Sequence, residues 1–312
     1  MNRSTLPQLE QQCSIIEEEM KHAWAAAQST PPARLYHYTD AQGLHGILSS
    51  GRFWATNIGF LNDRSELKYG CAIVTEALER RAHASSKLER EFIERALRVF
   101  NVFDGLFELY VACFCEDGDL LSQWRGYGGN GVGYAVAMDA RLMGLRTPGR
   151  TPVDFVLRRV IYDYSEQAQL IDSLTQKTVD LLLDIERESG EEVAWNALPR
   201  LCHFFRDEVS EFLFCFKHPA FREEAEWRAV SVAGLYDDDS RVKFRPSRAG
   251  LIPYVEMEFS PSAGQMTAKI PITEIVCGPT AYPYPAQKAL SLYLRNIGYS
   301  HVEVRASQIP LR

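Results

Sequence analysis

The sequence RLYHYT at residues 34–39 marks the start of the main body of the chain. Aromatic and β-branched residues fit a pleated, half-buried surface, so this stretch predicts a β-strand. Asp40 follows directly and can cap a short helix, and Gly51 stands where that helix is expected to end in the left-handed conformation. A second short strand, FWAT, is expected at residues 53–56. The main body therefore begins as strand, helix, strand.

The rest of the chain mixes strands and helices in irregular order. Asp63 with Glu66, and Ser86 with Glu89, predict two helix starts because each pair is a capping box. The absence of regular β-α-β alternation favours an α+β fold over a doubly wound sheet. Further helices are expected at residues 165–188, 192–216 and 285–296, and strands at residues 107–115, 132–138, 153–162, 226–233, 251–259, 268–277 and 301–305.

The composition indicates an ordinary globular protein. The 312 residues include 34 Lys and Arg against 41 Asp and Glu, a net charge of −7. This balance argues against a protein that coats nucleic acid non-specifically, because such binding neutralises many phosphates. No run approaches the roughly 18 apolar residues of a membrane helix, so no membrane association is expected. The acidic residues 17–19 and seven scattered cysteines favour a cytoplasmic protein with reduced thiols.

Residues 6–28 predict an amphipathic helix, with apolar residues at steps of three and four and acidic residues on the other face. The Pro-Pro pair at 31–32 ends it. We therefore expect a helical extension over residues 1–30 and a single α+β domain over residues 31–312. The extension either covers one face of the sheet or presents its Trp24-bearing stripe as a docking or homodimer surface.

Three stretches carry side chains suited to ligand chemistry, and the first is the predicted strand at residues 34–39 with the GILSSG sequence at 46–51. His37 at the end of a strand can hydrogen-bond ribose hydroxyls. The backbone of Thr39 can pair with an amide group. The alternative is a strand with an aromatic pair and a partly exposed histidine.

The second stretch is SQWRGYGGNG at residues 122–131. Its glycines permit a ligand to approach the backbone closely, and Trp124 and Tyr127 share a helical face on which a flat ring can stack. The alternative is a pair of core aromatics at a helix end. The stretch has neither a GxGxxG after a strand nor a Walker sequence, so it indicates neither a Rossmann site nor a P-loop.

The third stretch is KHPAFREEAEWR at residues 217–228. Glu224 and Glu226 point to the same side if the chain there is extended. A carboxylate beside a cleft can accept a hydrogen bond from a ribose hydroxyl and stabilise developing positive charge. The alternative is a solvated acidic turn that Arg222 and Arg228 neutralise.

Cys202, His203, Cys215 and His218 are the candidate metal ligands. Their spacing matches no standard zinc pattern, and the first two lie in an apolar stretch. No metal is therefore expected. A serine hydrolase has no support either, because the sequence lacks a GxSxG elbow.

Six motifs in this order resemble an uncharacterised bacterial family described as a domain of unknown function. The resemblance spans about residues 34–300, and the co-occurrence of the six motifs makes it fairly specific. The motifs are LYHYT at 35–39, FWATN at 53–57, LND at 61–63 with Glu66 beyond it, SxWxxY at 122–127, KHPAF at 217–221 and EWR at 226–228.

A more distant resemblance connects these stretches to the ADP-ribosyltransferase superfamily. His37-x-Thr39 followed by residues 46–51 is similar to the first motif of that superfamily, although Tyr38 stands in place of its glycine. The Glu-x-Glu sequence at residues 224–226 resembles the loop of the arginine-modifying branch. The resemblance implies an α+β fold whose core is a split mixed or antiparallel sheet, surrounded by helices.

The same resemblance implies an enzyme that takes NAD as substrate, cleaves its nicotinamide–ribose bond and transfers ADP-ribose to a protein or nucleic-acid acceptor. Glu226 would accept the hydrogen bond of the ribose 2′-hydroxyl and stabilise the resulting cation. His37 would anchor a ribose hydroxyl. The other implied contacts are Tyr38 and Thr39 at the strand end, Ser122, Trp124 or Tyr127 beside nicotinamide, Arg125 or Arg222 on the pyrophosphate, and Glu224 beside Glu226.

A non-catalytic alternative belongs to a different class of protein. A superfamily fold does not fix the reaction, so the chain is alternatively a nucleotide- or protein-binding module in stress response or phage defence. An RNA 2′-phosphate substrate is another enzymatic interpretation. It predicts a compact basic pocket, and the sequence shows no cluster of arginines for one.

Overall fold

A computed structural model of the protein describes most of the chain and divides it into two compact units, each assembled from three segments. The first unit comprises Met1–Ser29, Asp63–Leu106 and Val160–Phe221, and the second comprises Thr30–Asn62, Phe107–Arg159 and Arg222–Arg312. The expected domain boundary at residue 31 stays a prediction. The described residues are 5–27, 30–60, 65–83, 86–101, 109–127, 133–140, 155–232, 242–247, 250–257 and 270–310.

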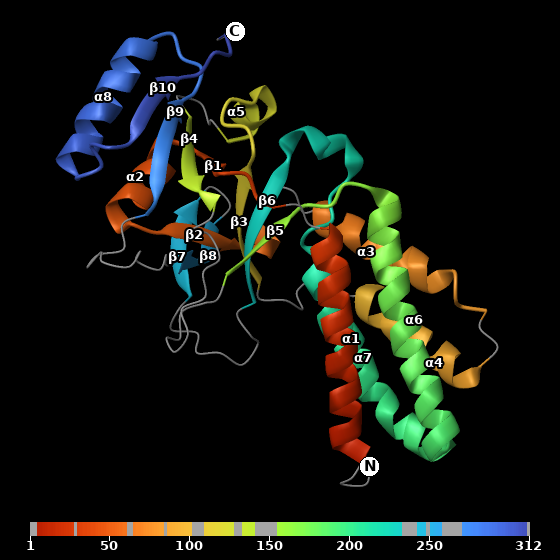
Figure 1. Ribbon diagram of the computed structural model, residues 1–312. Coiled ribbons are helices and arrows are strands. Elements are labelled where there is room, and N and C mark those ends of the chain that lie inside the picture. The colour runs from red at the N-terminus through yellow and green to blue at the C-terminus, as the bar shows by residue number, and fades with distance from the viewer. Residues whose placement is uncertain are drawn as a thin grey trace. The chain divides into compact units, whose positions relative to one another are not determined.

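The first unit is a helical bundle (Figure 1). Helices α6 and α7 pack on each other, and the other three helices pack against this pair. Aromatic and aliphatic side chains such as Phe92, Leu182 and Phe205 are fully buried within it. The amphipathic helix predicted near the start of the chain is confirmed. The helices are α1 (Thr5–Ala27), α3 (Ser65–Glu79), α4 (Lys87–Asn101), α6 (Tyr164–Ser189) and α7 (Glu191–Leu213).

Polar side chains fix where these helices begin. The Asp163 carboxylate accepts a hydrogen bond of 3.1 Å from the backbone N–H three residues on, which satisfies a donor that the first turn of α6 leaves unpaired. Ser86 Oγ accepts from the N–H of Glu89 at 3.4 Å, so this predicted cap is confirmed. The cap predicted at Asp63 lies outside the described residues. Gly190, with φ of 92°, turns the chain from α6 into α7.

The second unit is built on a mixed, largely antiparallel sheet, and the predicted α+β class is confirmed. Its strands within the described residues run in the order β10-β9-β4-β1-β3-β2-β8-β7, and β6 pairs with both β3 and β5. The β9–β10 pair is parallel and the other pairs are antiparallel. The strands are β1 (Arg34–Thr39), β2 (Phe53–Asn57), β3 (Leu109–Cys115), β4 (Tyr134–Asp139), β5 (Val156–Arg159), β6 (Glu226–Val232), β7 (Lys243–Ser247), β8 (Gly250–Met257), β9 (Ile272–Cys277) and β10 (Glu303–Ala306).

Strand β3 is the point at which the sheet splits. One edge of β3 pairs with β6 along its whole length. Two strands share the other edge: β2 pairs at Tyr110 and Val111, and β1 pairs at Cys115. Cys113 lies between these two pairings, so its carbonyl faces a gap between β1 and β2 where a side chain can reach the backbone.

Both faces of this sheet are packed with apolar side chains. Neighbouring residues on a strand face opposite ways, so Phe114 belongs to one buried cluster and Cys115 to the other. The first cluster packs with helices α2 (Ala41–Ser50) and α8 (Pro283–Asn296), and the second contains Trp124 of α5 (Leu121–Tyr127). Asp40 and Gly51, the latter with φ of 66°, cap the two ends of α2 as predicted. Short 3₁₀ turns lie at Ile58–Phe60 (η1) and Pro219–Glu224 (η3).

Candidate functional site

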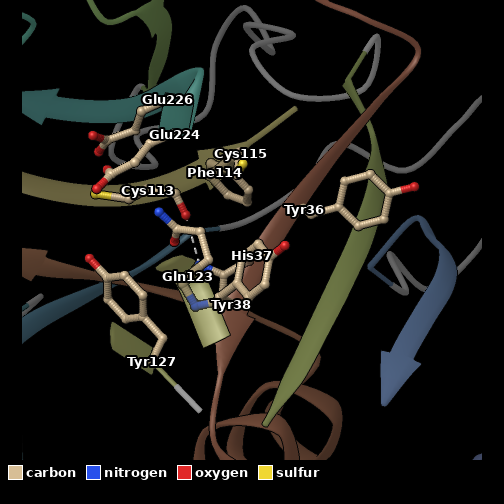
Figure 2. Close-up of a pocket in the computed structure, with 10 residues that line it drawn as sticks. All are labelled: Tyr36, His37, Tyr38, Cys113, Phe114, Cys115, Gln123, Tyr127, Glu224 and Glu226. Atoms are coloured by element: carbon tan, nitrogen blue, oxygen red, sulfur yellow. Dashed lines mark hydrogen bonds between the residues drawn. The ribbon is translucent and has the colours of Figure 1, made fainter. Parts of the chain in front are cut away.

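A pocket of about 340 Å³, counted with the space at its open mouth, lies at the split in the sheet (Figure 2). Strands β1, β3 and β6, helix α5 and the η3 turn supply its lining, which is Tyr36, His37, Tyr38, Cys113, Phe114, Cys115, Gln123, Tyr127, Glu224 and Glu226.

His37 fills the gap between β1 and β2 with its imidazole. Nδ1 lies 2.9 Å from the carbonyl oxygen of Cys113, so Nδ1 carries the proton and donates, and Nε2 is left as an acceptor. The ring packs edge-on against Phe53 at 5.3 Å and tilted against Phe114 at 5.7 Å. Burial lowers the pKa of His37 below 6.5, although the hydrogen bond to Cys113 opposes the shift. The site therefore presents a neutral imidazole at neutral pH.

Glu226 is a buried carboxylate at the first residue of β6, with 5% of its surface exposed. Arg228, two residues on and 2% exposed, donates to it twice, from Nε to Oε1 at 2.8 Å and from Nη2 to Oε2 at 3.0 Å. This two-point pairing fixes the orientation of the carboxylate and favours its charged form. Arg228 thus neutralises the charge of Glu226, as the alternative interpretation of the sequence predicts. The pair is buried beside the pocket, however, and is not in a solvated turn.

Ala225 sets the directions of the two neighbouring glutamates. Its φ of 39° is in the left-handed region, which costs a residue with a Cβ about 1–2 kcal/mol. Residue 225 joins the η3 turn to β6. Glu224 and Glu226 are therefore not on one extended segment, which was the condition for the expectation that they point to the same side. Both side chains nevertheless line the pocket, and Figure 2 shows them pointing toward the same side of it. Strain of this kind is concentrated at functional sites in proteins.

Helix α5 contributes two further lining residues, Gln123 and Tyr127, one helical turn apart. Gln123 is 7% exposed, and its amide makes no hydrogen bond with any residue that the structure describes. An amide that lines the pocket, with no described partner for its donor and acceptor, is suited to pair with a ligand amide. Sequence reasoning missed Gln123, although its spacing of four residues from Tyr127 was a usable signal.

Tyr38 lines the pocket but is held by structural contacts. Its hydroxyl donates to the carbonyl of Asp117 and accepts from the N–H of Leu120, each at 2.9 Å. Its ring packs edge-on against Trp124 at 4.7 Å, and Trp124 Nε1 donates to the carboxylate of Asp119 at 2.8 Å. Trp124 is 6% exposed and is not a lining residue. Of the two aromatics considered for stacking, Tyr127 is the one at the pocket.

Four other residues implied by the resemblance do not line the pocket. Thr39 ends β1 and pairs with β4, and the buried hydroxyl of Ser122 has no hydrogen-bond partner among the described residues. Arg125 and Arg222 are exposed on α5 and η3. The glycines at 128–131 and the LND motif at 61–63 fall outside the described residues.

Within the described part of the chain, no group of three or more His, Cys, Asp or Glu residues is placed to hold a metal ion, and no helix is long and apolar enough to cross a membrane. The seven cysteines are free thiols. Burial raises the pKa of the Cys115 thiol to about 12, which makes it a poor nucleophile at neutral pH.

A family model described as "Protein of unknown function (DUF2971)" matches residues 123–229, a span that runs from α5 into β6. It contains Gln123, Tyr127, Glu224 and Glu226 of the pocket, and it supports the expected resemblance to an uncharacterised family. No curated protein and no solved structure matches the chain. The resemblance to ADP-ribosyltransferases stays a prediction.

Proposed function

We propose that the protein binds NAD, cleaves its nicotinamide–ribose bond and transfers ADP-ribose to an acceptor. The observation that carries this proposal is that His37 of β1 and Glu226 of β6, nearly 190 positions apart in the sequence, line the same pocket. Gln123, Tyr127 and the carboxylate of Glu224 line the same pocket. These groups suit a nicotinamide riboside, which carries an amide, a flat ring and ribose hydroxyls.

The reaction requires a fixed negative charge beside the sugar. The bond between ribose C1′ and the pyridinium nitrogen breaks with both electrons going to nitrogen, so neutral nicotinamide leaves and positive charge develops on the ribose. A preorientated carboxylate stabilises this charge more strongly in the transition state than in the ground state. Glu226 is suited to this role because Arg228 holds it charged and in place. Glu224 then takes the proton from the acceptor nucleophile that attacks C1′.

The remaining lining groups orient the substrate. The Nε2 atom of neutral His37 accepts a hydrogen bond from a ribose hydroxyl, because Nδ1 is engaged by Cys113. Gln123 pairs with the carboxamide of nicotinamide. In the first superfamily motif a glycine serves this role, and in this chain Tyr38 stands in its place, so the role is open to Gln123. Tyr127, which is 39% exposed, stacks on the ring at the mouth of the pocket.

Chromatographic detection of nicotinamide released from NAD tests the proposal. Glu226→Gln is expected to lower the rate about 10²–10³-fold, as is usual when one transition-state contact is lost. Glu274→Gln is the matched control, since Glu274 is also a buried strand carboxylate bonded to arginine, and it does not line the pocket. Release at equal rates by the wild type and folded Glu226→Gln would contradict the assignment.

A non-catalytic nucleotide-binding module is the second candidate. The observation that favours it is the double contact from Arg228, which occupies one hydrogen-bonding site on each oxygen of Glu226. Stabilisation of the protein by NAD in thermal unfolding, without any release of nicotinamide, is the result that this second function predicts.

A further inference from the structure

Arg245 on β7 is a cation that the proposed site does not use. It is half-buried, and burial lowers the pKa of its guanidinium. Asp40 favours its charge without forming an ion pair. Its Nη2 donates a hydrogen bond of 2.9 Å to the hydroxyl of Thr56, and its Cζ lies 5.8 Å from the ring centre of Trp54.

The neighbouring cations, unlike Arg245, form ion pairs with a carboxylate. Lys243, on the same strand, pairs with Glu256 at 2.8 Å, and Arg52 pairs with the same carboxylate. No carboxylate of the described residues lies within 4 Å of Arg245. A guanidinium has five N–H donors, and the hydrogen bond to Thr56 uses one of them. Arg245 is thus a fixed, partly dehydrated cation with donors to spare.

The strand register places Arg245 on the same face of the sheet as Glu226. Residues opposite each other on paired strands share a face, as do alternate residues along a strand. Glu226 lies opposite Cys115, and alternation along β3 connects Cys115 to Val111. Val111 lies opposite Thr56, whose hydroxyl accepts the hydrogen bond from Arg245.

The offset between the two positions fits a ligand longer than the pocket. Glu226 and Thr56 are two strands apart, about 10 Å, and four residues along β3, about 13 Å, which gives about 16 Å between their Cα positions. Arg245 itself stands on β7, two strands beyond β2, and its side chain reaches back to Thr56, so its guanidinium lies about this far from Glu226. Arg245 therefore meets the part of a ligand that extends beyond a nicotinamide riboside.

We propose that Arg245, supported by Thr56 and Trp54, binds the diphosphate of a dinucleotide whose nicotinamide riboside end occupies the pocket. This inference rests on the proposed function for the identity of the ligand. A planar guanidinium matches two phosphate oxygens, and the ring of Trp54 and the hydroxyl of Thr56 hold its orientation. Arg245 takes the role that the sequence gave to Arg125 or Arg222, both of which are exposed.

Titration calorimetry on the full-length chain with ADP-ribose, inorganic pyrophosphate and nicotinamide riboside tests this role. Arg245→Gln keeps an N–H donor for Thr56 and removes the charge. It is therefore expected to lower the affinity for ADP-ribose and for pyrophosphate about ten- to a hundredfold. Nicotinamide riboside, which has no phosphate, is expected to bind both proteins within twofold. Lys243→Gln is the matched control, with the same charge change on the same strand.

Arg245→Lys keeps the charge but not the planar fork, so it is expected to lose less affinity than the glutamine variant. The inference is overturned if Arg245→Gln, with an unchanged melting temperature, binds ADP-ribose within twofold of the wild type. Equal losses in the Gln and Lys variants of Arg245, or in Lys243→Gln, overturn it as well, as does a wild type that binds neither phosphate probe. ADP-ribose cannot turn over, so nicotinamide release and ADP-ribose binding succeed or fail separately.

Discussion

Replacing Glu226 with glutamine is expected to destabilise the protein as well as to impair the reaction. The change keeps the size of the side chain and removes the negative half of the pair with Arg228, in which both residues are at most 5% exposed. Removing one partner of a buried pair costs about 3–5 kcal/mol. Glutamine retains one carbonyl oxygen that Arg228 can donate to, so we expect the lower end, about 3 kcal/mol.

Thermal unfolding followed by circular dichroism measures this loss. For a unit of roughly 150–250 residues, 1 kcal/mol corresponds to about 2–4 °C, so the melting temperature is expected to fall by about 6–12 °C. The double variant Glu226→Met, Arg228→Met removes both charges and is expected to recover most of the loss, because a buried pair is often replaced by apolar groups at little net cost. Glu223→Gln, an exposed neighbour, is the control and is expected to change stability by less than about 0.5 kcal/mol.

The expected destabilisation is contradicted if Glu226→Gln melts within 2 °C of the wild type, or if the double variant is less stable than the single one. The first result would mean that the pair is far better hydrated than its burial indicates. The activity of Glu226→Gln must also be compared with the wild type well below the lower of the two melting temperatures, so that a catalytic defect is not confused with unfolding.

Further predictions concern the backbone, packing and titration of the same unit. Ala225→Gly is expected to stabilise the protein to urea by about 0.5–1 kcal/mol, since relief of left-handed strain exceeds the added entropy of the unfolded chain; a loss of stability would contradict this. Gly118→Ala would place a Cβ 2.4 Å from the Tyr36 ring, so a loss of about 1–3 kcal/mol is expected, and unchanged urea unfolding would refute it. Because the folded-state pKa of His37 lies below 6.5, the unfolded chain takes up a proton first, and stability is expected to fall as the pH drops below about 6.5. His37→Gln should lack that component, and an identical pH profile would exclude His37 as its source. With a pKa of about 12, Cys115 should stay unlabelled by iodoacetamide at neutral pH in peptide mass spectrometry, and rapid labelling would show that its thiol is accessible and ionised.

Local sequence signals determined most of the secondary structure. Capping by Asp40 and Gly51 and the apolar periodicity of the helices act over a few residues, so they are visible without the fold. Strand β7 was missed because it is an edge strand, exposed along most of its length and interrupted by Pro246. Its sequence consequently has no alternation of apolar and polar residues.

The stretches that contribute to the pocket were also visible in the sequence, since residue types such as a strand-end histidine and paired glutamates carry the chemistry. Which side chain of each stretch reaches the pocket was decided by tertiary structure. Trp124 and Tyr127 share a helical face, yet packing against Tyr38 buries the first and leaves the second at the pocket. The sequence offered no means of choosing between them.

The sequence by itself thus determined the elements and the candidate stretches, because helix caps, turns and strand patterns depend on neighbours within a few positions. The tertiary structure alone decided that His37 fills a split beside Cys113 and that Arg245 shares the sheet face of Glu226. These relations depend on strand order and register between segments far apart in the chain. One residue of slip would turn each side chain to the opposite face, and no local pattern encodes that choice.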